Sequence, residues 1–258
     1  MIRCEGLWKR FGAKEVLRGV DLEIPDGQAL TIIGRSGTGK SVLLKHIIGL
    51  IPPDKGRVLV DGQDLSVLKY DELNDVRRRF GMLFQMAALF DSMTVGENVG
   101  LGLREHTKMP EAEVKARVAE KLAMVGLSGI EDLKPASLSG GMRKRVGLAR
   151  AIAMEPRCVL YDEPTTGLDP VTADTINVLI KDLQQKLGIT SIVVTHDMKS
   201  AAYVSDRIAM LHEGHLIFDG TFEEIEASPD PIVQQFITGS SHGPLTDEAP
   251  VVTARRKR

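Results

Sequence analysis

The stretch that decides the fold of this chain is Ala29–Ile33 followed by Gly34 to Ser41, ALTII-GRSGTGKS. The apolar run predicts a buried strand, and the pattern G-x-x-x-x-G-K-S follows it directly. Glycines in such a loop let the backbone turn its N–H groups toward phosphate oxygens, and the start of the next helix adds a partial positive charge. The sequence therefore predicts an ATP site, built from Gly34, Arg35, Ser36, Gly37, Thr38, Gly39, Lys40 and Ser41.

Two charged or polar side chains of this loop have predicted roles, and an acidic pair complements them. Lys40 is expected to hold the β- and γ-phosphates, and Ser41 is expected to ligate Mg²⁺. A second apolar strand at 158–161 ends in Asp162 and Glu163. Asp162 is placed to bind Mg²⁺, and Glu163 to orient and deprotonate an attacking water. Many strands end in acids, but after a phosphate loop such a pair becomes the expected second half of the site.

Two further predicted strands, 80–84 and 189–195, also end in polar residues, Gln85 and His196. Ligands bind at the carboxyl ends of parallel strands, so we expect both side chains at the same edge of the sheet. Gln85 is expected near Mg²⁺ or the water, and His196 near the γ-phosphate. A single Gln or His after a strand is more often an ordinary loop residue, and the coincidence of four strand ends favours the site.

The remaining pattern predicts an α/β protein. Buried strands between helical stretches indicate a parallel sheet covered by helices, and 20–24 and 57–60 lie beside turn signals that indicate a smaller antiparallel sheet. Between about 91 and 155 the pattern is helical, with four apolar residues on one predicted helix face: Val114, Val118, Leu122 and Val125.

Composition excludes several classes of function. The net charge of −2 over 258 residues gives no reason to expect a nucleic-acid partner. Cys4 and Cys158 stand in no metal-binding spacing and fit a reducing compartment. The opening residues do not resemble a signal peptide, and no apolar run is long enough to cross a bilayer. If the chain serves a membrane, a partner has to span it.

A second Gly-rich segment opens the predicted helix at 142–154. Ser139, Gly140 and Gly141 of LSGGM form a second potential anion site, with a hydroxyl and backbone donors at a helix start. The alternative interpretation is an ordinary capped helix. The favoured interpretation is that this site serves a nucleotide held by another subunit.

The phosphate loop, LSGGM (138–142), YDEPTTGLDP (161–170) and THD (195–197) together resemble the ATP-binding cassette (ABC) ATPases over about residues 1–238. The resemblance implies a P-loop NTPase with a RecA-like core at about 1–90 and 156–238, a small antiparallel β subdomain and an inserted α-helical subdomain at about 91–155. It also implies a homodimer that sandwiches two ATP molecules. Residues 239–258, rich in Gly, Ser and Pro and ending in four bases, are expected to form a mobile tail, whose bases could touch anionic lipid or a partner.

The resemblance also assigns residues. Ser139 and Gly141, with Gly140 between them, would contact ATP bound to the other subunit, and Asp169 would reach across the same interface. Phe11 would lie under the adenine, with a core phenylalanine as the alternative. Met142 stands where the family commonly has glutamine, and we expect activity to be kept because the backbone donors remain.

Three longer segments, 84–99, 138–156 and 196–220, resemble the Mla branch of these ATPases. This implies phospholipid transport between inner and outer membranes that maintains outer-membrane lipid asymmetry, from the cytoplasmic face of the inner membrane. The implied partners are an integral-membrane permease, an Mce-domain substrate-binding protein and a STAS-domain protein. Leu89 and Phe90 would line the permease groove or, alternatively, fill the core of the helical lobe. Other interpretations are a different cargo, such as an amino acid or toxic solvent, an ABC ATPase acting on ribosomes or DNA, and a regulatory module without turnover.

Overall fold

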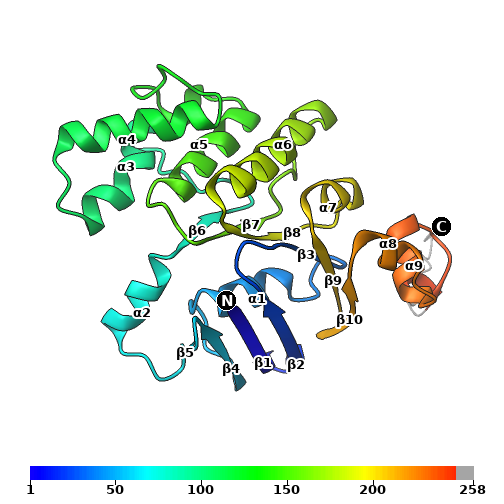
Figure 1. Ribbon diagram of the computed structural model, residues 1–258. Helices are drawn as coiled ribbons and strands as arrows, with labels where there is room; N and C mark the ends of the chain where they lie inside the picture. Colours follow the sequence, from blue (N-terminus) through cyan, green and yellow to red (C-terminus); the bar gives the residue numbers. More distant parts are fainter. Residues whose placement is uncertain (248–258) are drawn as a thin grey trace, which may run out of the picture.

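The structure of the chain is a computed structural model that describes residues 1–247. Its central sheet has six strands in the order β10-β9-β3-β8-β7-β6 (Figure 1). All neighbours pair in parallel except β10, which runs antiparallel to β9 at one edge, so the expected parallel sheet is a mixed one. The strands are β3 (Ala29–Ile33), β6 (Phe80–Leu83), β7 (Cys158–Asp162), β8 (Thr190–Val194), β9 (Arg207–His212) and β10 (His215–Gly220).

The inner strands are mostly apolar because both faces of the sheet are covered. Every residue of β3 and β8 is buried, including the polar Thr31, Thr190 and Ser191, which agrees with the apolar character of the runs from which the strands were predicted. The helices that accompany this sheet are α1 (Lys40–Ile47), α2 (Tyr70–Arg77), α6 (Pro170–Leu187) and α7 (Met198–Val204). No helix within residues 1–247 combines the length and the apolar character needed to span a membrane.

A separate four-stranded antiparallel sheet has the order β2-β1-β4-β5. Its strands are β1 (Ile2–Phe11), β2 (Lys14–Ile24), β4 (Lys55–Val60) and β5 (Gln63–Asp64). The predicted segments 20–24 and 57–60 belong to it, but β1 was not predicted. Gly6 has φ 54 at a register shift between Cys4 and Leu7, which interrupts the alternation by which a strand is recognised.

A helical lobe lies between β6 and β7 and is drawn in green in Figure 1. It consists of α3 (Val95–His106), α4 (Glu111–Met124), the 3₁₀ turn η1 (Pro135–Ser137) and α5 (Gly140–Ile152). The four residues predicted to share a helix face are all buried in one cluster with residues of α3 and α5. Leu89 packs against this cluster, as its alternative as a core residue predicts, whereas Phe90 is half exposed and does not fill the core. The permease groove stays a prediction.

The segment after Gly239 differs from the expected mobile tail as far as the structure describes it. It contains α10 (Pro244–Asp247), and the two helices that precede it are α8 (Phe222–Glu226) and α9 (Pro231–Thr238). Gln235 of α9 is buried; its amide nitrogen donates to the Ser240 carbonyl and the Thr246 hydroxyl, and its oxygen accepts from Leu245 N. One buried amide thus packs 240–246 against α9. The four terminal bases lie in 248–258, outside the described residues.

Candidate nucleotide site

The phosphate loop connects β3 to α1 and needs glycine at particular positions. Gly34 has φ 147, and a Cβ there would lie 2.3 Å from the carbonyl oxygen of Leu211. Gly39 precedes α1 with φ 108, and its Cβ would lie 2.9 Å from Val16 Cγ1. Both positions combine left-handed backbone with a close neighbour, so the loop shape depends on them.

Lys40 lies at the centre of this loop and is 6% exposed. Its ammonium donates to the carbonyl oxygens of Gly34, at 2.7 Å, and Arg35, at 3.0 Å. Burial lowers the pKa of Lys40, while the charges of Glu163 and Asp162 oppose that shift. The Lys40 ammonium group is therefore held by the backbone of the same loop that is predicted to surround a phosphate group.

Ser41 and Asp162 meet as the sequence predicts. The Ser41 hydroxyl donates to Asp162 Oδ1 at 2.9 Å, although the two residues lie 121 positions apart. Burial raises the pKa of Asp162, the charge of Glu163 raises it further, and the hydrogen bond from Ser41 opposes the shift. Hydroxyl and carboxylate oxygens are ligands that Mg²⁺ accepts. Ser41 and Gln85 both line the cavity beside the phosphate loop, whereas Asp162 does not line it and contacts Ser41. Within residues 1–247 no group of three His, Cys, Asp or Glu is placed to hold a metal, so Mg²⁺ here would depend on these oxygens and the substrate phosphates.

Glu163 follows β7 in a left-handed conformation, with φ 49. Its carboxylate accepts from the Thr166 hydroxyl at 3.0 Å, and His196 Nδ1 lies 3.0 Å from Oε1 and 2.9 Å from Oε2. The Glu163 carboxylate is mostly covered, at 13% exposure, whereas the His196 side chain is 59% exposed. A candidate base is thus oriented by two side chains, one of which is free to turn toward solvent.

These groups surround one cavity of about 660 Å³. Nine of the predicted residues line it: Arg35, Ser36, Gly37, Gly39, Lys40, Ser41, Gln85, Glu163 and His196. Gly34 and Thr38 shape the loop behind it, where the Thr38 hydroxyl donates to the Arg35 carbonyl at 2.9 Å. The cavity is also lined by Lys14, Val16 and Phe236, which sequence reasoning did not identify.

Phe11 is the last residue of β1, and 47% of its surface is exposed. The alternative prediction, that Phe11 is a residue of the hydrophobic core, is therefore wrong. Lys9 Nζ lies 5.6 Å from the centre of its ring. Phe11 pairs across the hairpin with Lys14, which lines the nucleotide cavity. An exposed aromatic ring beside this cavity suits stacking on a base.

Ser139, Gly140, Gly141 and Asp169 lie apart from this cavity and line no part of it. Ser139 caps α5, its hydroxyl accepting from Met142 N at 3.2 Å. Asp169 caps α6, accepting from the backbone of Val171 and Thr172. The capped-helix interpretation is therefore correct as a description of the fold, and the structure of one chain does not bring the two anion sites together.

Lys144 of α5 contacts two residues of the site, and Arg150 of the same helix contacts the segment just after Gln85; neither base was predicted. The Lys144 ammonium donates to the carbonyl oxygens of Gln85 and Glu163, the latter at 3.1 Å. Arg150 donates to the carbonyls of Ala87 and Ala88 at 2.7 and 2.6 Å. Burial lowers the pKa of Lys144 to about 8, opposed by the nearby carboxylates.

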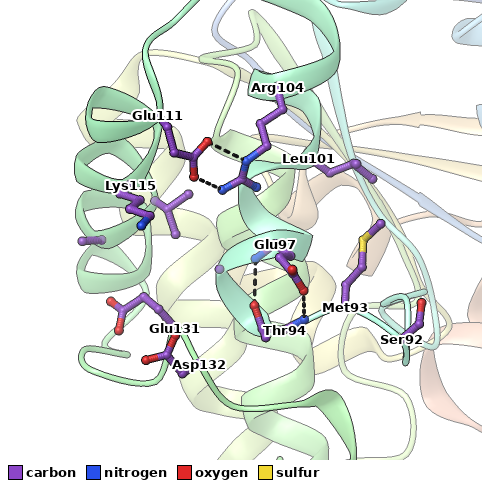
Figure 2. Close-up of a pocket in the computed structure, with 13 residues that line it drawn as sticks. Ser92, Met93, Thr94, Glu97, Leu101, Arg104, Glu111, Lys115, Glu131 and Asp132 are labelled. Atoms are coloured by element: carbon purple, nitrogen blue, oxygen red, sulfur yellow. Dashed lines mark hydrogen bonds and ion pairs between the residues drawn. The ribbon is translucent and has the colours of Figure 1, made fainter.

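A larger cavity of about 930 Å³ lies on the helical lobe, between α3 and α4 (Figure 2). Arg104 pairs with Glu111 through two hydrogen bonds of 3.0 and 2.7 Å, and Glu97 accepts from Thr94 N at 2.6 Å. These side chains satisfy one another, and none of the predicted nucleotide-site residues lines the cavity. The smaller cavity at the phosphate loop remains the candidate site.

Comparisons with known proteins agree with this site. Residues 17–166 match the family model of the ABC transporter. The probable ribonucleotide transport ATP-binding protein mkl of Mycobacterium tuberculosis is 44% identical over 244 residues, which cover 95% of this chain and 68% of that protein. The intermembrane phospholipid transport system ATP-binding protein MlaF of Haemophilus influenzae is 41% identical over 250 residues, covering 97% and 95%.

The fold agrees as well. The dimeric structure of the ATP-binding cassette MJ0796 in a post-hydrolysis state, bound to ADP and Pi, superposes with a TM-score of 0.79 at 35% identity. The match covers 86% of this chain and 98% of that one. A family match over more than half of the chain, two relatives above 40% identity and a cassette of the same fold lead to one assignment: the chain belongs to the ABC transporter family and is an ABC ATPase.

Proposed function

We propose that this chain is the ATP-hydrolysing subunit of a transporter that moves phospholipid between the inner and outer membranes. The observation that supports the cargo is the identity of 41% over nearly the full length of a protein named for intermembrane phospholipid transport. The chemistry is supported independently by one cavity that gathers Lys40, Glu163 and His196.

Phosphate binding begins with a change of partners. The loop N–H groups and the start of α1 provide donors for the β- and γ-phosphates, and Lys40 leaves the carbonyls of Gly34 and Arg35 to contact them. Because Lys40 is already at the loop, only its side chain has to turn. The ring of Phe11, exposed at the end of β1, supports the base of the nucleotide.

Hydrolysis depends on positioning and charge. Mg²⁺, held by Ser41, Asp162 and Gln85, would neutralise charge on the phosphates. Glu163 accepts a proton from the attacking water, and Thr166 fixes the direction of its carboxylate. His196 turns from Glu163 toward the γ-phosphate, which its exposed position permits.

The separation of the two anion sites within one chain supports a homodimer. Ser139, Gly140 and Gly141 would close over the ATP of the partner, with Asp169 at the same interface. A dimeric relative of the same fold was solved with ADP and Pi. ATP then joins the two subunits, and loss of the γ-phosphate releases them.

The partners and location follow from the proposed transport. The chain would sit at the cytoplasmic face of the inner membrane on a permease, which the half-exposed Phe90 beside the helical lobe would contact. An Mce-domain protein and a STAS-domain protein would complete the complex.

The test is affinity purification from detergent-solubilised membranes, with proteins and lipids identified by mass spectrometry. We expect a polytopic permease, an Mce-domain protein and bound phospholipid. Because one relative is named for ribonucleotide transport, ribonucleotide is quantified in the same sample. A permease with ribonucleotide, amino acid or solvent and no phospholipid would overturn the cargo assignment, and ribosomes or DNA without a permease would overturn the transport assignment.

A further inference from the structure

Lys144 joins the ends of two strands that supply different parts of the site. Its side chain is 5% exposed, and its ammonium donates to the carbonyl oxygens of Gln85 and Glu163. Gln85 lies just beyond β6, and Glu163 just beyond β7. Lys144 does not line the nucleotide cavity, so it contacts the site only through the backbone of the residues that do.

The backbone on both sides of this contact adopts conformations that need support. Glu163 has φ 49, and Ala87 and Ala88 have φ 59 and 47. Residues other than glycine keep such conformations only where the surrounding structure holds them. Arg150 holds the carbonyls of Ala87 and Ala88, as Lys144 holds those of Gln85 and Glu163.

Helix α5 packs closely against the segment 83–87, and this brings Lys144 and Arg150 within hydrogen-bonding distance of its backbone carbonyls. A Cβ at Gly147 would lie 2.8 Å from Leu83 Cδ1 and 3.2 Å from Ala87 Cβ. Lys144, Gly147 and Arg150 follow one another at intervals of three residues, which places them along one side of the helix. The helix whose first turn begins at Ser139 therefore rests directly on the segment that carries Gln85.

We propose that Lys144 is a positioning residue for ATP hydrolysis, which ties Gln85 and Glu163 to each other and to the helix that carries Ser139. The inference rests on the proposed hydrolytic function. When Ser139 engages a nucleotide of the partner subunit, a displacement of α5 is passed through Lys144 to the carbonyl of Glu163. The carboxylate that activates water is thereby aligned only when α5 is in place.

The alternative is that Lys144 only satisfies buried carbonyls and stabilises the lobe. Lys121 of α4 offers a matched control, because it is 2% exposed in the same lobe. It pairs with Glu120 and Glu155 at 2.9 and 3.1 Å, and it contacts no residue of the nucleotide cavity. A loss of stability alone would affect Lys144 and Lys121 variants alike.

The experiment compares Lys144→Met, Lys121→Met and the wild-type full chain, purified with the membrane partners that accompany it. Turnover at saturating ATP, KM, affinity for a fluorescent ATP analogue, and the thermal midpoint are measured. We expect Lys144→Met to lower kcat roughly 100-fold, the size of effect that a 1 Å misplacement of a reacting group produces. KM and analogue affinity should stay within about twofold, since no substrate contact is removed. Lys121→Met should lower the thermal midpoint and leave kcat near the wild-type value.

Equal kcat in Lys144→Met and the wild type, or equal losses in the two methionine variants, would overturn the positioning role. If the Lys144→Met variant does not fold, Lys144→Gln and Lys121→Gln are compared instead. Glutamine keeps N–H donors on a side chain one atom shorter, so Lys144→Gln should lower kcat by less than Lys144→Met but clearly below that of Lys121→Gln. Equal kcat in the two glutamine variants would overturn the positioning role. A wild-type complex without ATP turnover would instead refute the hydrolytic function on which the inference rests.

Discussion

Replacing Gly141 by alanine should strain the contact between α5 and α6, and a second change at Thr172 should remove the strain. An added Cβ at Gly141 would lie 2.5 Å from Thr172 Cγ2. Carbon atoms in contact prefer about 3.5–4.0 Å, so the helices have to separate by roughly 1 Å. Thr172 cannot simply rotate, because its hydroxyl donates to Asp169 Oδ2 at 2.6 Å.

The magnitude follows from two opposing effects. Overpacking of this kind costs about 1–3 kcal/mol, while alanine in place of glycine in a helix returns at most about 1 kcal/mol. Gly141→Ala should therefore lower the free energy of unfolding by up to about 3 kcal/mol. Thr172→Ser deletes the obstructing methyl group and keeps the hydroxyl. In that background, Gly141→Ala should be neutral or stabilising.

Urea denaturation of the wild type, both single variants and the double variant gives the interaction energy between the two sites. The proteins are measured without nucleotide, because Gly141 is also a candidate contact to ATP. We expect an interaction of about 1–3 kcal/mol in favour of the double variant. Additivity within about 0.5 kcal/mol would refute the proposed contact between the two residues.

Three further predictions concern the acidic pair and the cysteines. Glu163→Gln should lower kcat by about 10²–10⁴-fold with ATP affinity retained in a binding isotherm, and turnover at the native rate would show that another group is the base. Burial raises the pKa of Asp162, so its ionised form destabilises the folded chain above the unfolded-state pKa. Asp162→Asn should therefore raise the thermal midpoint at pH 7 without nucleotide, by a margin that shrinks as pH falls through the folded pKa; a lower midpoint at pH 7 would contradict this. Burial raises the pKa of Cys4 to about 12, and it raises that of Cys158 as well, so at pH 8 only about 10⁻⁴ of the Cys4 thiol is ionised. A thiol reagent should modify neither cysteine until the chain is unfolded. Rapid modification of one cysteine in the folded chain would contradict the burial described above.

The sequence predicted β3, β7 and β8 well because their signal is local, but it did not predict β9, which is also an inner strand. The range predicted for β3 matches the structure, and β7 extends one residue further than predicted. Most of their residues are apolar because both faces of the sheet are covered, so the sequence shows a short apolar run without a regular alternation. β10 gives no such signal: most of its residues are half buried, and the strand neither alternates nor runs apolar throughout. It was not predicted.

Contacts between distant segments account for what was missed. Lys144 stands between Arg143 and Arg145, a basic run typical of a solvated helix face, and its partner Gln85 lies 59 residues away. The composition of 239–247 favours an unpacked chain, whereas the buried Gln235 pairs with three of its residues. In both cases the local structure depends on one polar side chain that the tertiary fold buries, and the sequence nearby gives no sign of that burial.

The two hydrogen bonds of Lys40 to its own loop have a consequence for how fast and how selectively the site fills. The ammonium holds the carbonyl groups of Gly34 and Arg35 together and so fixes the shape of the loop from within the chain. The loop then loses its conformational entropy when the chain folds and not when a nucleotide binds, which favours rapid binding of the nucleotide. The same ammonium has to be displaced, so an isolated inorganic phosphate ion competes poorly, while a nucleotide brings the contacts of its base and its other phosphates. A loop that holds its own cation thereby favours ligands that replace several contacts at once.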